Sequence, residues 1–420
     1  MSPAGQSVRI AQIDGSALLR RIEHICNTGA TRLAYSEDDI RGRSLVTEMM
    51  RDVGLEVHTD PAGNIIGRRA GRKELPPLAF GSHVDTVRNG GRYDGVLGVM
   101  AGIECIAALQ QTGCTTDHPL ELMVFANEEG QIFGALCGSR AIAGLLGPDD
   151  LAHRDGASRT LADAILAIGG DPSQLRAAAR KSGDISAFVE LHIEQGGVLE
   201  SSKVPIGIVE GISGISYTDV RVLGTANHSG TTVMKLRKDA LVAASELVLS
   251  VRTAALERKC RVATVGQMTV SPNATNIIPG EVTLTIEIRD LERGKILETL
   301  DHIRYCGRAI AERSGIQLDF SERALIEPVP CSPVVQEAIA QSCLDLGLKF
   351  QAMPSGAGHD AQMMARIGPM GMIFVPSVGG ISHSPRESTS AEDCARGAQV
   401  LLQTILRLDD TLSRSTGSRA

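Results

Sequence analysis

Four apolar, strand-like runs of this chain each lead into a histidine or a carboxylate. The runs and the polar residues that follow them are 78–81 with His83, 122–126 with Glu128 and Glu129, 188–191 with His192, and 372–375 with His383. Ligands of a parallel α/β sheet bind beyond the carboxyl ends of its strands, so such endings can meet at one point. Three imidazoles together with carboxylates suit a borderline divalent metal such as zinc, cobalt or manganese. The pattern therefore favours an α/β sheet with a metal site, and indicates a metal-dependent hydrolase.

The acidic pair Glu128-Glu129 is the most informative of these endings. Two adjacent carboxylates repel one another unless one binds a cation and the other holds or transfers a proton. Consecutive side chains project differently, so Glu129 can bind a metal while Glu128 faces the attacking water as a general base. The alternative for this pair is a solvated acidic turn. A fifth candidate ligand, Asp94, lies in the glycine-rich loop 89–95, although Asp-Gly is also an ordinary turn sequence.

Each histidine has a plainer interpretation when it is taken alone. In the His-x-Asp sequence at the first strand end, His83 binds metal and Asp85 accepts the other ring hydrogen, but a surface pair has the same spacing. His192 lies within an apolar run, where a buried structural histidine is common. His383 follows two glycines, which are typical of ligand loops and of turns in general. Their joint placement after strands is what favours the metal site.

Length and composition limit the classes of protein to which the chain can belong. With 420 residues, two domains are expected. A formal net charge of -7 argues against a general affinity for nucleic acid, and no stretch approaches the ~20 apolar residues of a membrane span. The nine cysteines include no Cys-x-x-Cys pair, and residues 1–23 contain no apolar signal core. A reducing, cytoplasmic location is therefore expected.

The chain changes character near residue 212. Before it, strand-like and helical patterns alternate, which predicts a mostly parallel sheet with helices on both faces. After it, the order becomes strand, helix, strand, strand, helix, strand, as in a ferredoxin-like α+β unit. Candidate ligands lie on both sides of this unit, so we predict a domain 213–327 inserted into a catalytic domain formed by 1–212 and 328–420. The expected elements are helices 16–23, 41–53, 96–109, 238–256, 296–313 and 391–408, a hairpin of 56–59 with 64–67, and strands 217–223, 261–270, 282–289 and 317–321.

Seven motifs, in this order, resemble the amidase/hydantoinase/carbamoylase branch of the di-zinc, aminoacylase-like metallopeptidases. They are GSHVDTVRNGGRYDGVLGV, NEEG, ELHIEQG, GTANHSGTTVMKLRKDA, PNATNIIPG, SGAGHDA and GISHSPRE. The resemblance runs from about Ser36 to the last helix. It implies a metal-dependent amidohydrolase that cleaves the terminal ureido group of an N-carbamoyl-L-amino acid or a related ureido acid. Allantoate and ureidoglycolate remain alternatives, because each presents a carboxylate next to a ureido group.

The resemblance also implies a role for each matching residue. Two divalent ions would be bound, one by His83 and His192 and the other by Glu129 and His383, with Asp94 between them. Zinc, manganese, cobalt and nickel all accept such donors. Glu128 would be the general base, Asp85 would orient a ligand, and the substrate contacts would be Gln195, His228, Asn276, Arg289, Gly358 and His359. In the family, the residue that matches His228 reaches the site of the other subunit, so a homodimer is implied, with the inserted domain as both lid and dimerisation domain.

Other activities are less favoured by the same motifs. The family often has proline at Val233 and Gly197 and aspartate at Glu287, and these departures leave the metal set intact. Hydrolysis of peptides or N-acyl amino acids is the nearest different reaction, but peptidase relatives place a carboxylate where this chain has His192. A binding protein without activity is disfavoured because every expected ligand is present together with Glu128.

Overall fold

The computed structural model describes residues 11–29 and 31–417. Residues 1–10, on which the expectation about a signal core partly rests, lie outside these ranges. The chain forms two compact units: unit 1 is Met1–Glu210 with Cys331–Ala420, and unit 2 is Gly211–Pro330. None of the helices within 11–29 and 31–417 has the length and the apolar character that crossing a membrane demands.

Within the described residues, unit 1 is organised around a nine-stranded sheet. Its strands are β1 (Glu56–Thr59), β2 (Ile65–Arg69), β3 (Leu78–His83), β4 (Leu120–Phe125), β5 (Ala187–Ile193), β6 (Ile206–Ile212), β14 (Phe350–Ser355), β15 (Met370–Val375) and, at the boundary and by residue number in unit 2, β13 (Val329–Pro330). They lie in the order β1-β2-β4-β3-β5-β15-β6-β13, and β14 pairs with β6. The central strands β4, β3, β5 and β15 are parallel, whereas β1 and β2 pair antiparallel with their neighbours and β6 pairs antiparallel with β15 and β13. The predicted mostly parallel central sheet is confirmed.

The helices of unit 1 begin and end at recognisable residues. They are α1 (Gly15–Cys26), α2 (Glu37–Asp52), α3 (Val96–Thr112), α4 (Cys137–Ile142), α5 (Pro148–Leu151), α6 (Leu161–Ala167), α7 (Val198–Ser202), α10 (Pro333–Asp345), α11 (Asp360–Met364) and α12 (Ala391–Gly417), with 3-10 turns η1 (Pro172–Ala178) and η3 (Val378–Gly380). Ser36 caps α2 through its side chain, and Gly113 ends α3 in a left-handed conformation. The last helix is longer than predicted, since it continues past residue 408 to Gly417.

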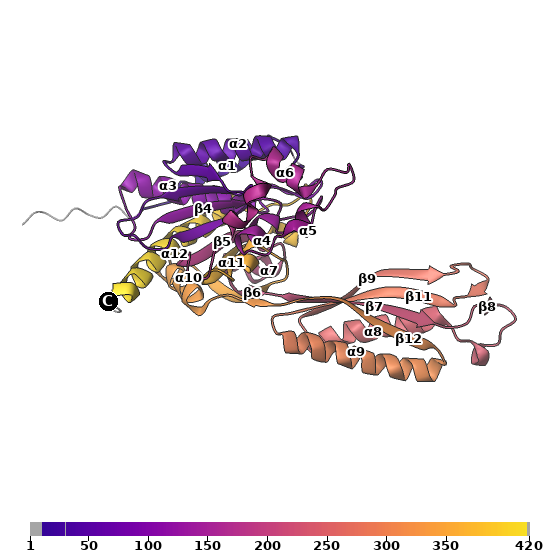
Figure 1. The fold of residues 1–420 in the computed structure, drawn as a ribbon. Coiled ribbons are helices and arrows are strands. Elements are labelled where there is room, and N and C mark those ends of the chain that lie inside the picture. Colours follow the sequence, from indigo (N-terminus) through magenta and orange to yellow (C-terminus); the bar gives the residue numbers. More distant parts are fainter. Residues whose placement is uncertain (1–10, 30, 418–420) are drawn as a thin grey trace, which may run out of the picture. The chain divides into compact units, whose positions relative to one another are not determined.

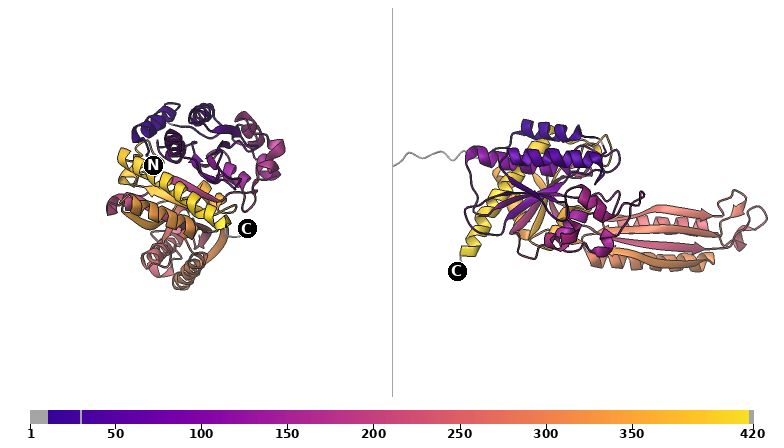
Figure 2. Two further views of the ribbon diagram at one scale, coloured as in Figure 1. Left: turned by 90° about the vertical axis from the view of Figure 1, so that its left-hand side faces the viewer. Right: turned by 45° about the horizontal axis from the view of Figure 1, so that its top comes forward.

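Strand β5 shows how the sheet separates the apolar core from the polar residues. Ala187, Val189 and Leu191 pack into the core that α3 and α12 share with the sheet. Glu190 and His192 alternate with them and therefore face the other side, where the backbone N–H of Ala361 at the start of α11 donates to Glu190. The strands of this sheet splay across one another in the right-hand view of Figure 2, which is the usual twist of such sheets.

Unit 2 contains a four-stranded sheet whose neighbours are all antiparallel, in the order β12-β7-β11-β9. Its strands are β7 (Gly214–Leu223), β9 (Val262–Ser271), β11 (Glu281–Asp290) and β12 (Gln317–Ile326), and a short pair is formed by β8 (Asn227–His228) and β10 (Ile277–Ile278). The helices are α8 (Ala240–Leu256) and α9 (Arg293–Ser314), with a 3-10 turn η2 (Met234–Leu236). Figure 1 shows α8 and α9 side by side along one face of this sheet.

The core of unit 2 follows from alternation in its central strand. Val282, Leu284, Ile286 and Ile288 of β11 are buried against α8 and α9, while the residues between them are more exposed. The two helices and the strands β7, β9 and β11 lie within three residues of their expected ranges, whereas β12 continues five residues past the expected 317–321 and β8, β10 and η2 were not predicted. That unit 2 acts as a lid and a dimerisation domain stays a prediction.

Candidate metal centre

The predicted ligands lie at the carboxyl ends of adjacent parallel strands. His83 is the last residue of β3, His192 is the second-last residue of β5, and Glu129 follows β4 by four residues. His383 lies beyond β15 and the turn η3. Since the four strands are consecutive in the order β4-β3-β5-β15, their endings share one edge of the sheet. Parallel pairing therefore brings together residues up to 300 positions apart in the sequence.

Asp94 lies at the middle of this group. Its Oδ1 is 3.1 Å from Nε2 of His192 and 3.6 Å from Nε2 of His83. Its Oδ2 is 3.3 Å from Nε2 of His383, and that nitrogen is 3.6 Å from Oε2 of Glu129. Of the three sets of potential ligand atoms among the described residues, two consist only of predicted ligands: one is His83, Asp94 and His192, and the other is Asp94, Glu129 and His383. The third is Glu190, His192 and His359. The structure thus brings all five predicted ligands together, with Asp94 common to the first two sets.

The ring nitrogens are oriented as a metal site requires. Nδ1 of His83 is 3.0 Å from the carbonyl oxygen of Asp85, and Nδ1 of His192 is 2.9 Å from that of Ile193. A carbonyl oxygen only accepts hydrogen bonds, so each Nδ1 carries a proton, and Nε2 is the nitrogen that faces Asp94 and is left to bind a metal ion. Imidazole and carboxylate donors of this kind fit a divalent zinc, manganese, cobalt or nickel ion.

Asp85 contacts its neighbours differently from the prediction. Its carboxylate does not accept the ring hydrogen of His83, because Oδ1 and Nδ1 are 3.7 Å apart. The backbone carbonyl of Asp85 makes that contact instead. The carboxylate accepts the backbone N–H groups of Glu128 and Glu129, each at 3.2 Å. Asp85 therefore orients the acidic pair with its side chain and the histidine with its main chain.

The conformation of the surrounding loops leaves little space for side chains. Gly95 has φ +65, and a Cβ there would lie 2.5 Å from the ring of His83. A Cβ at Gly91 would lie 2.0 Å from the carboxylate of Glu387. Two non-glycine residues of the site, Gln195 and His383, also have positive φ values of 57 and 53. Such backbone conformations cost roughly 1–3 kcal/mol each and concentrate at functional sites.

Electrostatics at this position favours a cation. Burial raises the pKa of Glu129 to about 8, with the charge of Asp94 acting in the same direction. Burial alone would lower the pKa of His192, but Asp94 raises it to about 9, and a hydrogen bond to Asp94 also raises the pKa of His383 to about 9. Burial lowers the pKa of His83 to about 4, so this ring is neutral. The carboxylates thus attract positive charge to the point where the ligand atoms meet.

Glu128 is placed to handle a proton. Its Oε2 is 3.7 Å from Nε2 of His83, and its residue is 9% exposed. Burial raises its pKa well above the usual value, and the charges of Asp360 and Glu129 raise it further. A carboxyl group with a raised pKa, beside the ligands yet outside both ligand sets, has the properties of a general base.

Gln195 and the 358–359 turn were both expected to contact substrate. Nε2 of Gln195 donates to Oδ2 of Asp94 at 2.8 Å, so this side chain borders the ligands. Gly358 lies just before His359, which is 1% exposed and packs edge-on against His192 with ring centroids 4.6 Å apart. Nε2 of His359 is 2.9 Å from Oγ of Ser355. The ring of His359 therefore lies buried behind His192, and its contact with substrate stays a prediction, as does that of Gly358.

Several polar residues around the site were not predicted. Glu387 accepts hydrogen bonds from the backbone N–H groups of Tyr93 and Asp94 and from Oγ of Ser382. Oγ of Ser382 is also 3.0 Å from Oδ2 of Asp94, so its one hydrogen is shared between the two carboxylates. Glu190 is fully buried and accepts from Oγ of Ser82 at 2.7 Å. Glu387 ends the motif GISHSPRE and Glu190 begins ELHIEQG. Both could have been found by examining each motif over its whole length instead of only the strand endings.

Three further predicted residues lie in unit 2. His228 and Asn276 are close to one another, because the backbone N–H of Ser229 donates to the carbonyl of Asn276. Arg289 lies near the end of β11, where its guanidinium donates two hydrogen bonds to Glu287, at 2.7 and 3.1 Å. Glu287 lies two residues before Arg289, on the same face of the strand.

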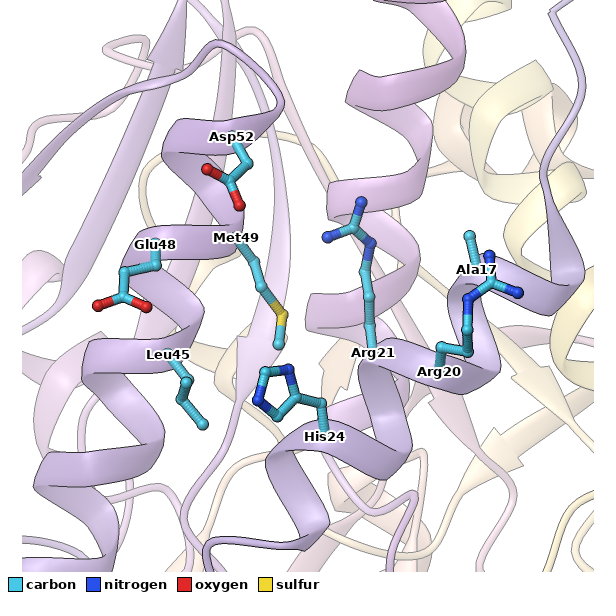
Figure 3. A pocket seen from close by; sticks show the side chains of 8 residues that line it. All are labelled: Ala17, Arg20, Arg21, His24, Leu45, Glu48, Met49 and Asp52. Atoms are coloured by element: carbon cyan, nitrogen blue, oxygen red, sulfur yellow. The ribbon is translucent and has the colours of Figure 1, made fainter.

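A separate pocket of about 340 Å³ lies between α1 and α2. Figure 3 shows Arg20, Arg21 and His24 from α1 opposite Glu48 and Asp52 from α2. Nε of Arg21 is 2.5 Å from the buried carboxylate of Glu104. The residues that line this pocket include none of the predicted ligands, so it is distinct from the candidate metal centre.

Comparisons with known proteins agree with this geometry. The sequence model of Peptidase family M20/M25/M40 matches residues 79–407. An N-carbamoyl-L-amino acid amidohydrolase from Geobacillus stearothermophilus is 42% identical over 382 residues, which cover 90% of this chain and 93% of the relative. An allantoate amidohydrolase from Bacillus subtilis (strain 168) is 38% identical over 385 residues, which cover 90% and 93%. The crystal structure of an amidase of the hydantoinase/carbamoylase family from Burkholderia multivorans has a TM-score of 0.90 at 33% identity and covers 95% of this chain and 98% of that one. The expected resemblance to this branch is confirmed, and the chain belongs to Peptidase family M20/M25/M40.

Proposed function

We propose that the protein is a metal-dependent amidohydrolase that cleaves the terminal ureido C–N bond of an N-carbamoyl-L-amino acid. The observation that carries this proposal is the meeting of three histidines and two carboxylates beside the buried Glu128. The similarity to N-carbamoyl-L-amino acid amidohydrolases supports the choice of substrate. Allantoate is the second candidate, because the allantoate amidohydrolase relative spans as much of the chain.

Two divalent ions would be held by the residues of the candidate metal centre. His83 and His192 would bind one, Glu129 and His383 the other, and Asp94 would contact both. When bound, such ions supply positive charge that polarises a carbonyl group and makes water more acidic. A ureido carbonyl is a poor electrophile, so both effects are needed.

Glu128 would carry the proton through the reaction. It accepts a proton from the attacking water as the water oxygen bonds to the ureido carbon, and the carbonyl oxygen becomes an oxyanion. His228 would donate a hydrogen bond to that oxyanion. Glu128 then returns the proton to the departing nitrogen, the C–N bond breaks, and ammonia leaves. The remaining carbamate loses carbon dioxide and yields the free amino acid.

Arg289 would bind the carboxylate of the substrate. Its planar guanidinium matches a carboxylate with two parallel hydrogen bonds, as its present pairing with Glu287 illustrates. Glu287 holds the guanidinium in position along β11, so a substrate carboxylate would displace this pairing. Asn276 would contribute a further donor to the substrate.

Geometry within unit 2 supports a homodimer in which each site uses both subunits. Arg289 lies eight residues along β11 from Glu281, which corresponds to about 27 Å in an antiparallel strand. His228 and Asn276 belong to the β8–β10 pair, beyond the Glu281 end of that strand. A substrate with only a few atoms between its carboxylate and its ureido group cannot span this distance. His228 and Arg289 of one chain would therefore serve different sites.

The test is a substrate panel on metal-reconstituted enzyme. N-carbamoyl-L-amino acids, allantoate, ureidoglycolate and N-acetyl-L-amino acids are compared by release of ammonia and of amino acid. Ammonia from N-carbamoyl-L-amino acids with the highest kcat/KM supports the proposal, and a higher value for allantoate supports the second candidate. Hydrolysis of the N-acetyl compounds without ammonia from any ureido acid would refute both.

A further inference from the structure

We propose that Arg237 is a positioning residue that holds His228 with its Nε2–H directed outward as a hydrogen-bond donor. This inference rests on the proposed function, in which His228 donates to the oxyanion. It concerns the loop of residues 228–237, which runs from β8 through η2 and lies entirely within unit 2.

The backbone around His228 determines which ring nitrogen carries the proton. Nδ1 of His228 accepts hydrogen bonds from the backbone N–H of Gly230 at 3.0 Å and of Thr231 at 3.3 Å. A backbone N–H only donates, so Nδ1 presents its lone pair and a neutral ring carries its hydrogen on Nε2. The two bonds also fix the direction of the ring, because they anchor one edge of it to the main chain. Nε2–H then points away from the loop, as a donor to an oxyanion requires.

Arg237 determines the orientation of the peptide groups that make these bonds. Its Nη2 donates to the carbonyl oxygen of Ser229, and its Nε donates to that of Thr232 at 3.0 Å. The carbonyl of Ser229 and the N–H of Gly230 belong to one planar trans peptide, so they point in opposite directions. A guanidinium that holds this carbonyl on one side therefore directs the N–H to the other side, toward Nδ1 of His228.

The second contact of Arg237 closes the loop. The N–H of Thr232 donates to the carbonyl of His228 at 3.2 Å, and the carbonyl of Thr232 accepts from Arg237. The loop is exposed and bears the apolar residues Val233, Met234 and Leu236 on its surface, so burial contributes little to its order. The planar guanidinium presents donors at fixed spacing to both carbonyl oxygens, whereas a lysine ammonium, whose three donors all sit on one nitrogen, does not reproduce that spacing.

A double-mutant cycle on the full-length, metal-loaded protein tests the proposal. Arg237→Met is expected to lower kcat about 10- to 100-fold, with metal content and melting temperature nearly unchanged. In a His228→Ala background, Arg237→Met should lower kcat no further, because Arg237 acts through that ring. Lys235→Met is the matched control, since it removes an exposed cation from the same loop, and it should retain the activity of the unsubstituted protein. Arg237→Lys should recover only part of the loss.

A second measurement does not depend on activity. ¹⁵N spectra of histidine-labelled protein report the protonation of each ring nitrogen, and the signals that vanish in His228→Ala belong to His228. Arg237→Met should shift the Nδ1 signal away from that of a hydrogen-bond acceptor, while Lys235→Met leaves it in place. The proposal would be overturned if the reductions in kcat of the two single mutants multiply in the double mutant, or if the Nδ1 signal is unchanged in Arg237→Met. Full activity of His228→Ala would instead remove His228 from the proposed function, and the ¹⁵N spectra would still decide whether Arg237 orients the ring.

Discussion

Gly95→Ala should remove most of the metal affinity although it alters no ligand. Gly95 precedes α3, and a Cβ there would lie 2.5 Å from Nε2 and Cε1 of His83. An ordinary van der Waals contact begins at 3.4 Å, so the ring or the loop has to move by about 0.9 Å. Metal–ligand distances tolerate changes of about 0.2 Å, and loss of a group that orients a ligand lowers affinity about 10- to 100-fold. We expect a loss of zinc affinity at the upper end of this range, about 100-fold or about 2.7 kcal/mol.

Gly113→Ala is the matched control for this substitution. Gly113 lies at the other end of α3 with φ +66, and no atom lies within 4 Å of the Cβ position. Both variants pay the backbone cost of a positive φ, about 1–2 kcal/mol, but only Gly95→Ala moves His83. Zinc affinity is measured by competition with a coloured chelator, and folding by the melting temperature. If Gly95→Ala binds zinc within about threefold of Gly113→Ala, His83 is not a ligand held by this loop and the reasoning fails.

Three further predictions concern single residues. Glu128→Gln should keep its full metal content and lose about 10²- to 10⁴-fold in kcat, measured by ammonia release; retained turnover would exclude it as the base. Arg289→Ala should raise KM at least tenfold with unchanged metal content, whereas Arg221→Ala, which breaks the exposed pair with Glu281 on the same sheet, should leave KM unaltered. Burial raises the pKa of Asp39 to about 6, so its contribution to stability is fully present below about pH 4 and is lost as the pH rises through 6. Between pH 4 and pH 7 the free energy of unfolding of Asp39→Asn should therefore rise by on the order of 3 kcal/mol relative to that of the unsubstituted protein. A difference in denaturation midpoint between the two proteins that stays constant over this pH range would contradict this.

Much of the architecture was predictable because its signals are local. Apolar runs of strand length, each followed by a ligand residue, indicated parallel strands with a shared edge. The alternation in Val282, Leu284, Ile286 and Ile288 is visible in the sequence and matches the buried face of β11. Patterns of this kind depend on neighbouring residues, so a single sequence is enough to find them.

Contacts that depend on main-chain geometry or on distant loops were not predictable. The carbonyl of Asp85, rather than its carboxylate, meets His83 because the turn after β3 brings the main chain closer. Glu387 binds the N–H groups of Tyr93 and Asp94 across more than 290 residues of sequence, and no local pattern announces such a pair. The sequence of the Ala-Gly-His-Asp turn likewise gives no sign that the ring of His359 is buried against His192. Sequence spacing shows which polar residues belong to the site more readily than it shows the direction in which their side chains point.

The position of β15 between β5 and β6 has a consequence for synthesis on the ribosome. Both neighbours emerge before residue 213, but the strand that joins them begins only at Met370. Until then the nascent chain carries an apolar strand with an open hydrogen-bonding edge, which other chains can pair with. The four-stranded sheet of unit 2 is formed by residues between Gly214 and Ile326, so it can be completed before the sheet of unit 1. A product truncated before Met370 would consequently be an aggregation-prone fragment. The dependence of the nascent chain on chaperones should fall steeply once β15 has emerged from the ribosome.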